Sequence, residues 1–111
     1  MNIIHTKSFD SSLKKLKRHH VEYENIFKIL DIIENADNFC ELCLLPQVSM
    51  YSFERLKHDK SDYYSFNPKK KGGRIRLIVK PNDNNTVELF LILVSYEHYE
   101  DFDPKRVIFY E

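Results

Sequence analysis

The 111-residue chain has no long hydrophobic run, no excess of either charge and only two cysteines. Its apolar stretches fall short of the roughly 20 residues that a membrane-spanning helix needs, and its first residues lack the hydrophobic segment of a signal peptide. We therefore expect no membrane association and a cytoplasmic location. The length predicts one domain, residues 1–111, because a chain of this size can build one hydrophobic core but not two.

Charge is balanced over the whole chain but not along it. Seventeen Lys and Arg residues match seventeen Asp and Glu residues, so no net positive field attracts a nucleic acid to the entire molecule. Basic residues gather at 14–20 and 69–76, and acidic residues gather at 22–41 and 97–103. A basic patch on a neutral protein is compatible with RNA binding at one defined place, although most charge runs form solvated surfaces.

The two cysteines, Cys40 and Cys43, form a single Cys-x-x-Cys. This spacing occurs in redox sites and in one half of a zinc site. No second Cys or His pair has ligand spacing, and no strand precedes the motif in a thioredoxin-like unit, so we predict neither a metal site nor a redox site. On a helix the two cysteines would share a stripe with Leu44, a pattern that favours packing in the core.

The first third of the chain predicts a short strand followed by two helices. Residues 2–5 form the strand, and Ser8 is a plausible N-cap of the first helix. That helix carries apolar residues at helical spacing through residue 17: Phe9, Leu13 and Leu16. Since its outer face is strongly basic, the helix is amphipathic and must cover something apolar.

The second helix is predicted from Glu22 to Asn35, joined to the first by a brief link. One apolar stripe runs along it: Tyr23, Ile26, Phe27, Leu30 and Ile33. Two such helices form an antiparallel hairpin. For residues 36–50 we predict a short helix followed by a loop, because Pro46 must end any helix that contains residues 40–45.

Residues 62–99 predict three consecutive antiparallel strands. They begin near residue 62, at residue 73 and at residue 87, and the last runs to residue 96. Turns at 68–73 and at the Asn-rich segment 81–86 separate the strands. In the middle strand one face is core, with Ile75, Leu77 and Val79, and the other carries Arg74, Arg76, Ile78 and Lys80.

These elements together predict an α+β fold. We expect a mainly antiparallel four- or five-stranded sheet, with strand 2–5 on its edge and the N-terminal helical hairpin packed on one face. Residues 100–111 add an acidic tail with a final turn and a short strand near residues 106–110. The tail could crowd the neighbouring site or add an edge strand.

Three separated segments carry the chemistry when they are read together. They are Phe-Glu-Arg-Leu-Lys-His-Asp at 53–59, Arg-Ile-Arg-Leu-Ile-Val at 74–79 and Ser-Tyr-Glu-His-Tyr at 95–99. In this order they resemble the RelE/ParE toxin superfamily, most closely its YoeB-like ribosome-dependent mRNA interferases. The resemblance extends over about residues 51–99, and more weakly over the strand and helices before them.

The resemblance implies cleavage of messenger RNA on the ribosome, by attack of a ribose 2′-hydroxyl on the adjacent phosphate. Glu54 would be the base, Arg76 the phosphate clamp and His98 the acid, with Tyr99 stacking on a base or orienting the phosphate. Further RNA and phosphate contacts would come from Lys57, His58, Arg74, Lys70 and Lys71. The scheme needs no metal and no cofactor, and it implies a cognate antitoxin as protein partner.

Other interpretations of the same residues remain open. Glu54 could be an ordinary loop carboxylate, Arg76 could pair with Glu88 across the hairpin, and His98 could cap the last strand. Lys69 to Lys71 could keep a turn soluble. At the level of the whole protein, the alternatives are a ParE-like toxin that inhibits DNA gyrase and a catalytically inactive relative.

Overall fold

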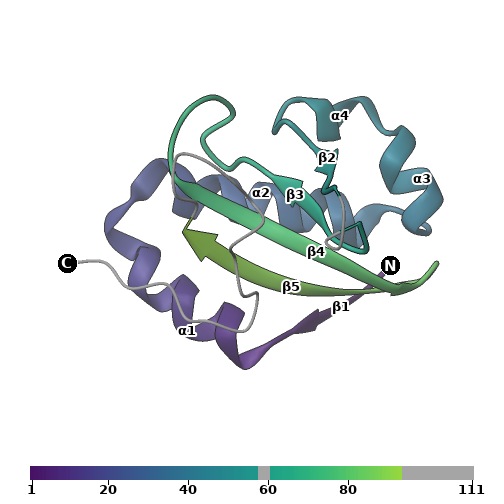
Figure 1. Ribbon diagram of the computed structural model, residues 1–111, viewed down its shortest axis with the longest axis horizontal. Coiled ribbons are helices and arrows are strands. Elements are labelled where there is room, and N and C mark those ends of the chain that lie inside the picture. Colours follow the sequence, from purple (N-terminus) through teal and green to yellow (C-terminus); the bar gives the residue numbers. More distant parts are fainter. Residues whose placement is uncertain (58–60, 94–111) are drawn as a thin grey trace.

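The sheet of the computed structural model has five strands in the order β1-β5-β4-β3-β2, and the structure describes residues 1–57 and 61–93. The strands are β1 (Asn2–His5), β2 (Glu54–Arg55), β3 (Tyr64–Phe66), β4 (Ile75–Asp83) and β5 (Thr86–Leu93). β2, β3, β4 and β5 pair antiparallel in turn, while β1 pairs with β5 in parallel. The α+β class, the three-stranded meander and the edge position of residues 2–5 are therefore confirmed (Figure 1).

The helices follow β1 directly. They are α1 (Lys7–Lys15), the short 3-10 helix η1 (Leu16–Arg18), and α2 (His20–Asn35), which lies behind the sheet in Figure 1. Their apolar residues pack on one face of the sheet, against Ile75, Leu77 and Val79 of β4. The predicted core face of the middle strand is thus correct. The antiparallel hairpin arrangement of α1 and α2 stays a prediction.

The start of α1 differs from the predicted one. Its N-cap is Thr6 and not Ser8: Thr6 Oγ1 accepts a hydrogen bond from the backbone N–H of Phe9 at 3.1 Å. The same hydroxyl donates to the carbonyl oxygen of Leu89 in β5 at 2.7 Å. Because this second bond ties the helix start to the sheet, tertiary structure decides between two residues that are equally able to cap.

The buried stripe of α2 also differs from the predicted one. Ile26, Leu30 and Ile33 are buried as expected, but Phe27 is 43% exposed and Ile29 is fully buried in its place. Phe27 packs edge-to-face on Tyr23, with ring centroids 5.0 Å apart. The buried side chains of α2 are those at positions i, i+3, i+4 and i+7 counted from Ile26, and they face the sheet. Phe27 is not at one of these positions, so it lies outside the buried stripe.

Residues 36–50 fold as two short helices, α3 (Phe39–Leu44) and α4 (Pro46–Ser49). Pro46 does end the first helix, but it also begins the second one, so the predicted loop was wrong. The predicted core stripe of Cys40, Cys43 and Leu44 was wrong as well. Both cysteines are exposed and Leu44 is 82% exposed, while Phe39 and Leu42 turn into the core.

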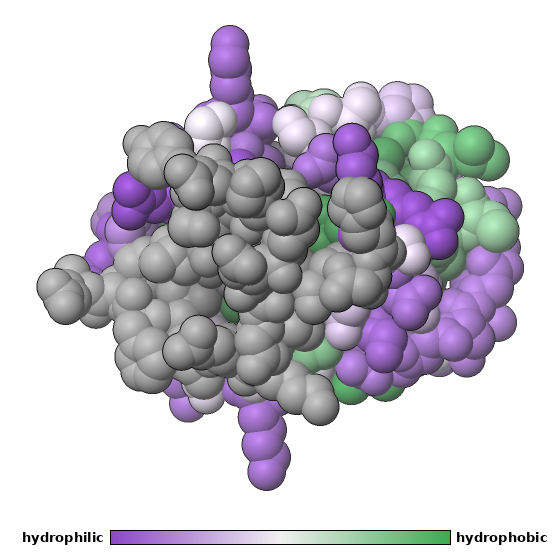
Figure 2. Space-filling view, in the orientation of Figure 1, coloured by the Kyte–Doolittle hydropathy of each residue, from purple (hydrophilic) through white to green (hydrophobic). Residues whose placement is uncertain are grey.

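Leu44 in α3 and Met50 at the end of α4 are exposed. Figure 2 shows a hydrophobic area at its upper right, where α3 and α4 lie in Figure 1. Desolvation raises the pKa of the Cys43 thiol, and the neighbouring Cys40 raises it further. A raised thiol pKa lowers the fraction of reactive thiolate.

Among residues 1–57 and 61–93, no helix is both long and apolar enough to cross a membrane.

β4 continues further than predicted. It extends through Pro81 to Asp83, with an irregularity in the pairing between these two residues, and the turn consists of Asn84 and Asn85. Asp83 Oδ1 accepts from the backbone N–H of Asn85 at 2.7 Å, which closes the turn. The described part of the last strand ends at Leu93, so the predicted continuation to residue 96 and the short strand near 106–110 lie outside the described residues.

Candidate active site

The second face of the sheet, opposite the core helices, carries the candidate active site. A small apolar cluster lies on it: Leu56, Ile78 and Phe90, with Tyr63 packed against them. This cluster forms because side chains alternate along β4, so that Ile78 points away from the face that holds Leu77 and Val79. Leu56 joins from the end of β2, since its N–H donates to the carbonyl of Tyr63 at 2.9 Å.

Strand pairing places Glu54 and Arg76 on this face together. Glu54 in β2 is opposite Ser65 in β3, and Ser65 is opposite Ile78 in β4. Cross-strand partners point to the same face, and so does a residue two positions along, which is Arg76. Two strand spacings and one two-residue step separate the Cα atoms by about 12 Å. Between the two lies Ser65, only 1% exposed.

The Arg76 side chain is held at the beginning of β4. Its Nη1 donates to the carbonyl oxygens of Ile75 at 2.9 Å and Gly73 at 3.2 Å. Arg76 is opposite Ile92 in β5, whereas Glu88 is opposite Lys80 and accepts from Asn82 Nδ2 at 2.9 Å. Arg76 and Glu88 are therefore not cross-strand neighbours, and the pairing proposed between them was wrong.

Some of the other predicted residues adjoin the strands of Glu54 and Arg76 along the chain. Lys57 is exposed directly after β2, and Arg74 is exposed directly before β4. Lys70 and Lys71 are exposed in the loop that leads into β4. Three further predicted residues, His58, His98 and Tyr99, lie outside the described residues.

The loop before β4 borders the segment that leads into β2. Asn67 N–H donates to the carbonyl of Tyr51 at 2.7 Å, and Ser52 Oγ donates to the carbonyl of Lys70 at 2.9 Å. Lys70 Nζ lies 5.6 Å from the centre of the Tyr51 ring. The cationic loop and the strand of Glu54 are therefore fixed relative to one another.

Sequence reasoning missed two residues that shape this region. Asn67 is 6% exposed; its Nδ2 donates to the carbonyl of Gly72 at 2.9 Å, and its Oδ1 accepts from Lys69 N–H at 3.0 Å. Ser65 was expected in an alternating strand and, with the two tyrosines before it, resembles a short aromatic-Ser segment of the toxin superfamily, but no burial was predicted for it. For Asn67 a signal existed, because Asn before Pro favours the start of a turn. Nothing in the pattern around Ser65 indicated its burial.

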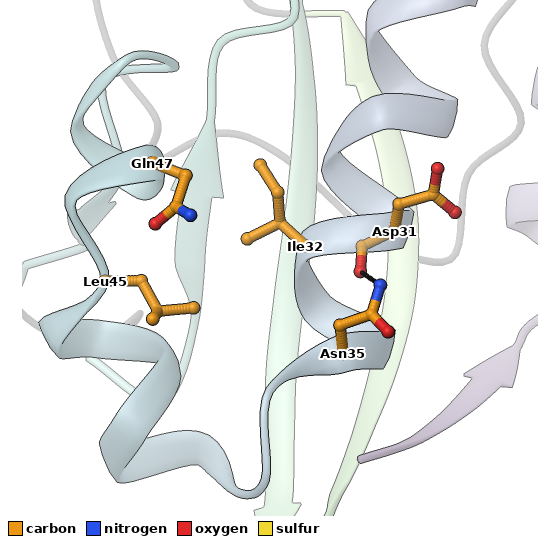
Figure 3. Close-up of a pocket in the computed structure, with 5 residues that line it drawn as sticks. All are labelled: Asp31, Ile32, Asn35, Leu45 and Gln47. Atoms are coloured by element: carbon orange, nitrogen blue, oxygen red, sulfur yellow. Dashed lines mark hydrogen bonds between the residues drawn. The ribbon is translucent and has the colours of Figure 1, made fainter.

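Two cavities lie elsewhere, beside α2. One of about 300 Å³ lies between α2 and the α3–α4 segment, lined by Asp31, Ile32, Asn35, Leu45 and Gln47 (Figure 3). Another of about 470 Å³ lies between β1 and α2 and also includes Asp31. Neither contains Glu54 or Arg76. Across residues 1–57 and 61–93, no group of three or more His, Cys, Asp or Glu residues is arranged to hold a metal ion.

The chain was compared with known proteins. No family model matches it, and no curated protein matches it by sequence. Among solved structures it is similar to a YoeB/ParE toxin from Agrobacterium tumefaciens, with a TM-score of 0.51 and 20% sequence identity over 88% of this chain and 100% of that chain. The RelE/ParE-like fold expected from the ordered motifs is therefore confirmed.

Proposed function

We propose that this chain, which has the fold of a YoeB/ParE toxin, is the toxin of a toxin–antitoxin pair and cleaves messenger RNA on the ribosome. One observation carries the proposal: Glu54 and Arg76 share the sheet face opposite the core helices. A carboxylate and a guanidinium about 12 Å apart at their Cα atoms can reach a phosphodiester from two sides, because both side chains are long. We expect the protein to act in the cytoplasm, with a cognate antitoxin as partner.

In this proposal Glu54 takes the proton of a ribose 2′-hydroxyl while its oxygen attacks the adjacent phosphorus. Arg76 stabilises the negative charge that develops on the phosphate oxygens, since its planar fork can bond two of them at once. His98 donates a proton to the 5′-oxygen as the bond between phosphorus and that oxygen breaks. The products are a 2′,3′-cyclic phosphate and a 5′-hydroxyl.

The remaining predicted residues have supporting roles in the proposal. Tyr99 stacks on a base or orients the phosphate. Contacts to the RNA backbone come from Lys57, His58, Arg74, Lys70 and Lys71. The bonds from Arg76 to the Ile75 and Gly73 carbonyls support its role, because a guanidinium already fixed loses less freedom when it binds phosphate.

The test is cleavage of a translated message by the purified protein, with mapping and chemical analysis of the new ends. We expect 5′-hydroxyl ends, and we expect Arg76→Ala to lower the cleavage rate about 10²- to 10³-fold, the usual effect of removing one stabilising donor. Arg76→Lys keeps the charge without the fork and should recover only part of the rate. Intact message, with or without ribosomes, contradicts the proposal.

The second candidate function is inhibition of DNA gyrase without RNA cleavage. It is favoured by the similar structure, whose name joins YoeB with ParE. A supercoiling assay with the same protein separates the two candidates. Gyrase inhibition that persists in Arg76→Ala and Glu54→Gln, with message left intact, would replace the nuclease proposal.

A further inference from the structure

Nine of the seventeen basic residues lie in two short segments that contain none of the seventeen acidic residues. The segments are residues 11–21 and 63–76. Their basic residues are Lys14, Lys15, Lys17 and Arg18 in the first, and Lys69, Lys70, Lys71, Arg74 and Arg76 in the second. The neutral total therefore hides a separation of charge.

The fold brings the two segments to one end of the sheet. The first forms the end of α1, all of η1 and the start of α2; the second includes β3 and leads into β4. Asn25 Nδ2 donates to the carbonyl oxygen of Pro68 at 2.7 Å, in a buried contact. Asn25 lies about 7–8 Å along the axis from the start of α2, close to one Debye length at physiological salt. In Figure 1 the start of α2 lies at the left, and the loop between β3 and β4 lies at the upper left.

The lysines of the second segment, residues 69–71, lie in a loop that hydrogen bonds hold in one conformation. Asn67 holds it from inside through bonds to Lys69 and Gly72. Lys70, Gly72 and Gly73 all have left-handed backbone conformations, with φ of 68°, 70° and 75°. Such a conformation costs a lysine roughly 1 kcal/mol or more, so a strained non-glycine residue points to a function for its side chain.

The opposite end of α2 is acidic. Exposed carboxylates follow one another there and into α3: Asp31, Glu34, Asp37 and Glu41. The N-terminus of α2, the positive end of its dipole, lies at the basic end. An anionic ligand is therefore drawn to one end of the molecule. Lys14 and Lys15 also offset the negative end of the α1 dipole, but this role does not extend to the loop lysines.

We propose that five exposed lysines at this end bind the phosphate backbone of base-paired RNA. We call them the basic end: Lys14, Lys17, Lys69, Lys70 and Lys71. Lysine binds phosphate as a point charge, and helical RNA is bound mainly through its backbone, whereas single strands require aromatic rings for stacking. The choice of RNA rests on the proposed function. The contact itself is separate from Glu54 and extends the surface to α1 and η1.

The experiment measures binding of a labelled RNA hairpin of about 16 base pairs by fluorescence anisotropy between 50 and 200 mM salt. All proteins carry Glu54→Gln so that the probe is not consumed. Lys17→Gln with Lys71→Gln removes one charge from each segment of the basic end. The matched control, Lys7→Gln with Lys28→Gln, removes two exposed lysines elsewhere, with the same change in net charge.

We expect the basic-end pair to reduce the slope of log K against log salt by about 1.5 to 2 and to weaken binding about tenfold, with the control within twofold of the parent. Equal weakening by the control overturns the inference, and so does tighter binding of a single strand. The inference is also overturned if polyglutamate displaces the labelled hairpin as effectively as unlabelled hairpin does. The basic end would then bind an acidic protein equally well.

The two proposals fail in different ways. A chain with Glu54 intact that cleaves no message, while the basic-end pair still weakens hairpin binding, refutes the nuclease and leaves this inference standing. Cleavage at normal rate with hairpin binding unaffected by the basic-end pair refutes the inference and leaves the nuclease standing.

Discussion

Arg76 and Leu77 are neighbours on β4 and lie in opposite environments. Leu77 is fully buried among the helices, whereas Arg76 points to the face with the small cluster of Leu56, Ile78 and Phe90. The helix-covered face holds most of the buried apolar side chains, and the other face holds few. One strand thus carries a core residue and a proposed phosphate-binding residue side by side, and the difference in their contribution to stability should be measurable.

The largest expected effect is on the helix-covered face. Leu77→Ala should lower the free energy of unfolding by about 2–5 kcal/mol, because it removes a fully buried side chain and leaves a cavity. Denaturation with urea measures this change. Arg76→Ala is the matched neighbour and should cost only about 1 kcal/mol, because the side chain is half-buried and its removal loses two hydrogen bonds to nearby carbonyls without opening a core cavity. Similar losses at both positions would break the comparison between the faces.

An intermediate effect is expected where the two faces meet, in the loop before β4. Asn67→Ala should cost about 1–3 kcal/mol, because it removes a buried side chain and leaves the half-buried Gly72 carbonyl and Lys69 N–H without their partner. Hydrogen exchange should rise first in residues 67–73. Asn82→Ala is the control, since this amide bonds Glu88 in an exposed position. If hydrogen exchange in residues 67–73 is the same in Asn67→Ala as in the parent, the conformation of the lysine-bearing loop does not depend on the Asn67 amide.

The smallest effect is expected on the outer surface, at α3. The hydrogen bond that the protonated Glu41 carboxyl donates to Asp37, together with repulsion between the two carboxylates, raises the pKa of Glu41. The folded chain therefore binds this proton more tightly than the unfolded chain, so the stabilising contribution is present at low pH and is lost as pH rises through the pKa of Glu41. Asp37→Asn should bring the Glu41 pKa toward its ordinary value in an NMR titration. A pKa that does not move would assign the shift to another cause.

Alternation and helical spacing predicted the elements whose patterns are long. β4, β5 and α2 span eight residues or more, and their predicted types were right. α3 has six residues and β2 has two, so neither carries enough periods to show which side faces the core. This is why Cys40 and Cys43 were assigned to the wrong side of their helix.

The candidate site was predictable only in part, for a different reason. The resemblance to the toxin superfamily implied a base at residue 54 and a phosphate clamp at residue 76, but their position on one face depends on the register of β2 with β3 and of β3 with β4. Register is set by pairing between distant segments, and a shift of one residue would turn Glu54 to the other face. Alternation along β4 placed Arg76 on the face away from the core, but the two residues of β2 are too few to show which face Glu54 takes.

The parallel pairing of β1 with β5 joins residues about 84 positions apart, with Asn2 opposite Thr86. Synthesis proceeds from the N-terminus, so β1 cannot pair with β5 until residues 86–89 have been made. Pairing between segments so far apart in the sequence slows folding, because the chain loses conformational entropy before the stabilising contacts have formed. In the proposed toxin–antitoxin pair, an antitoxin made at the same time would have an interval in which to meet this chain before its sheet is complete.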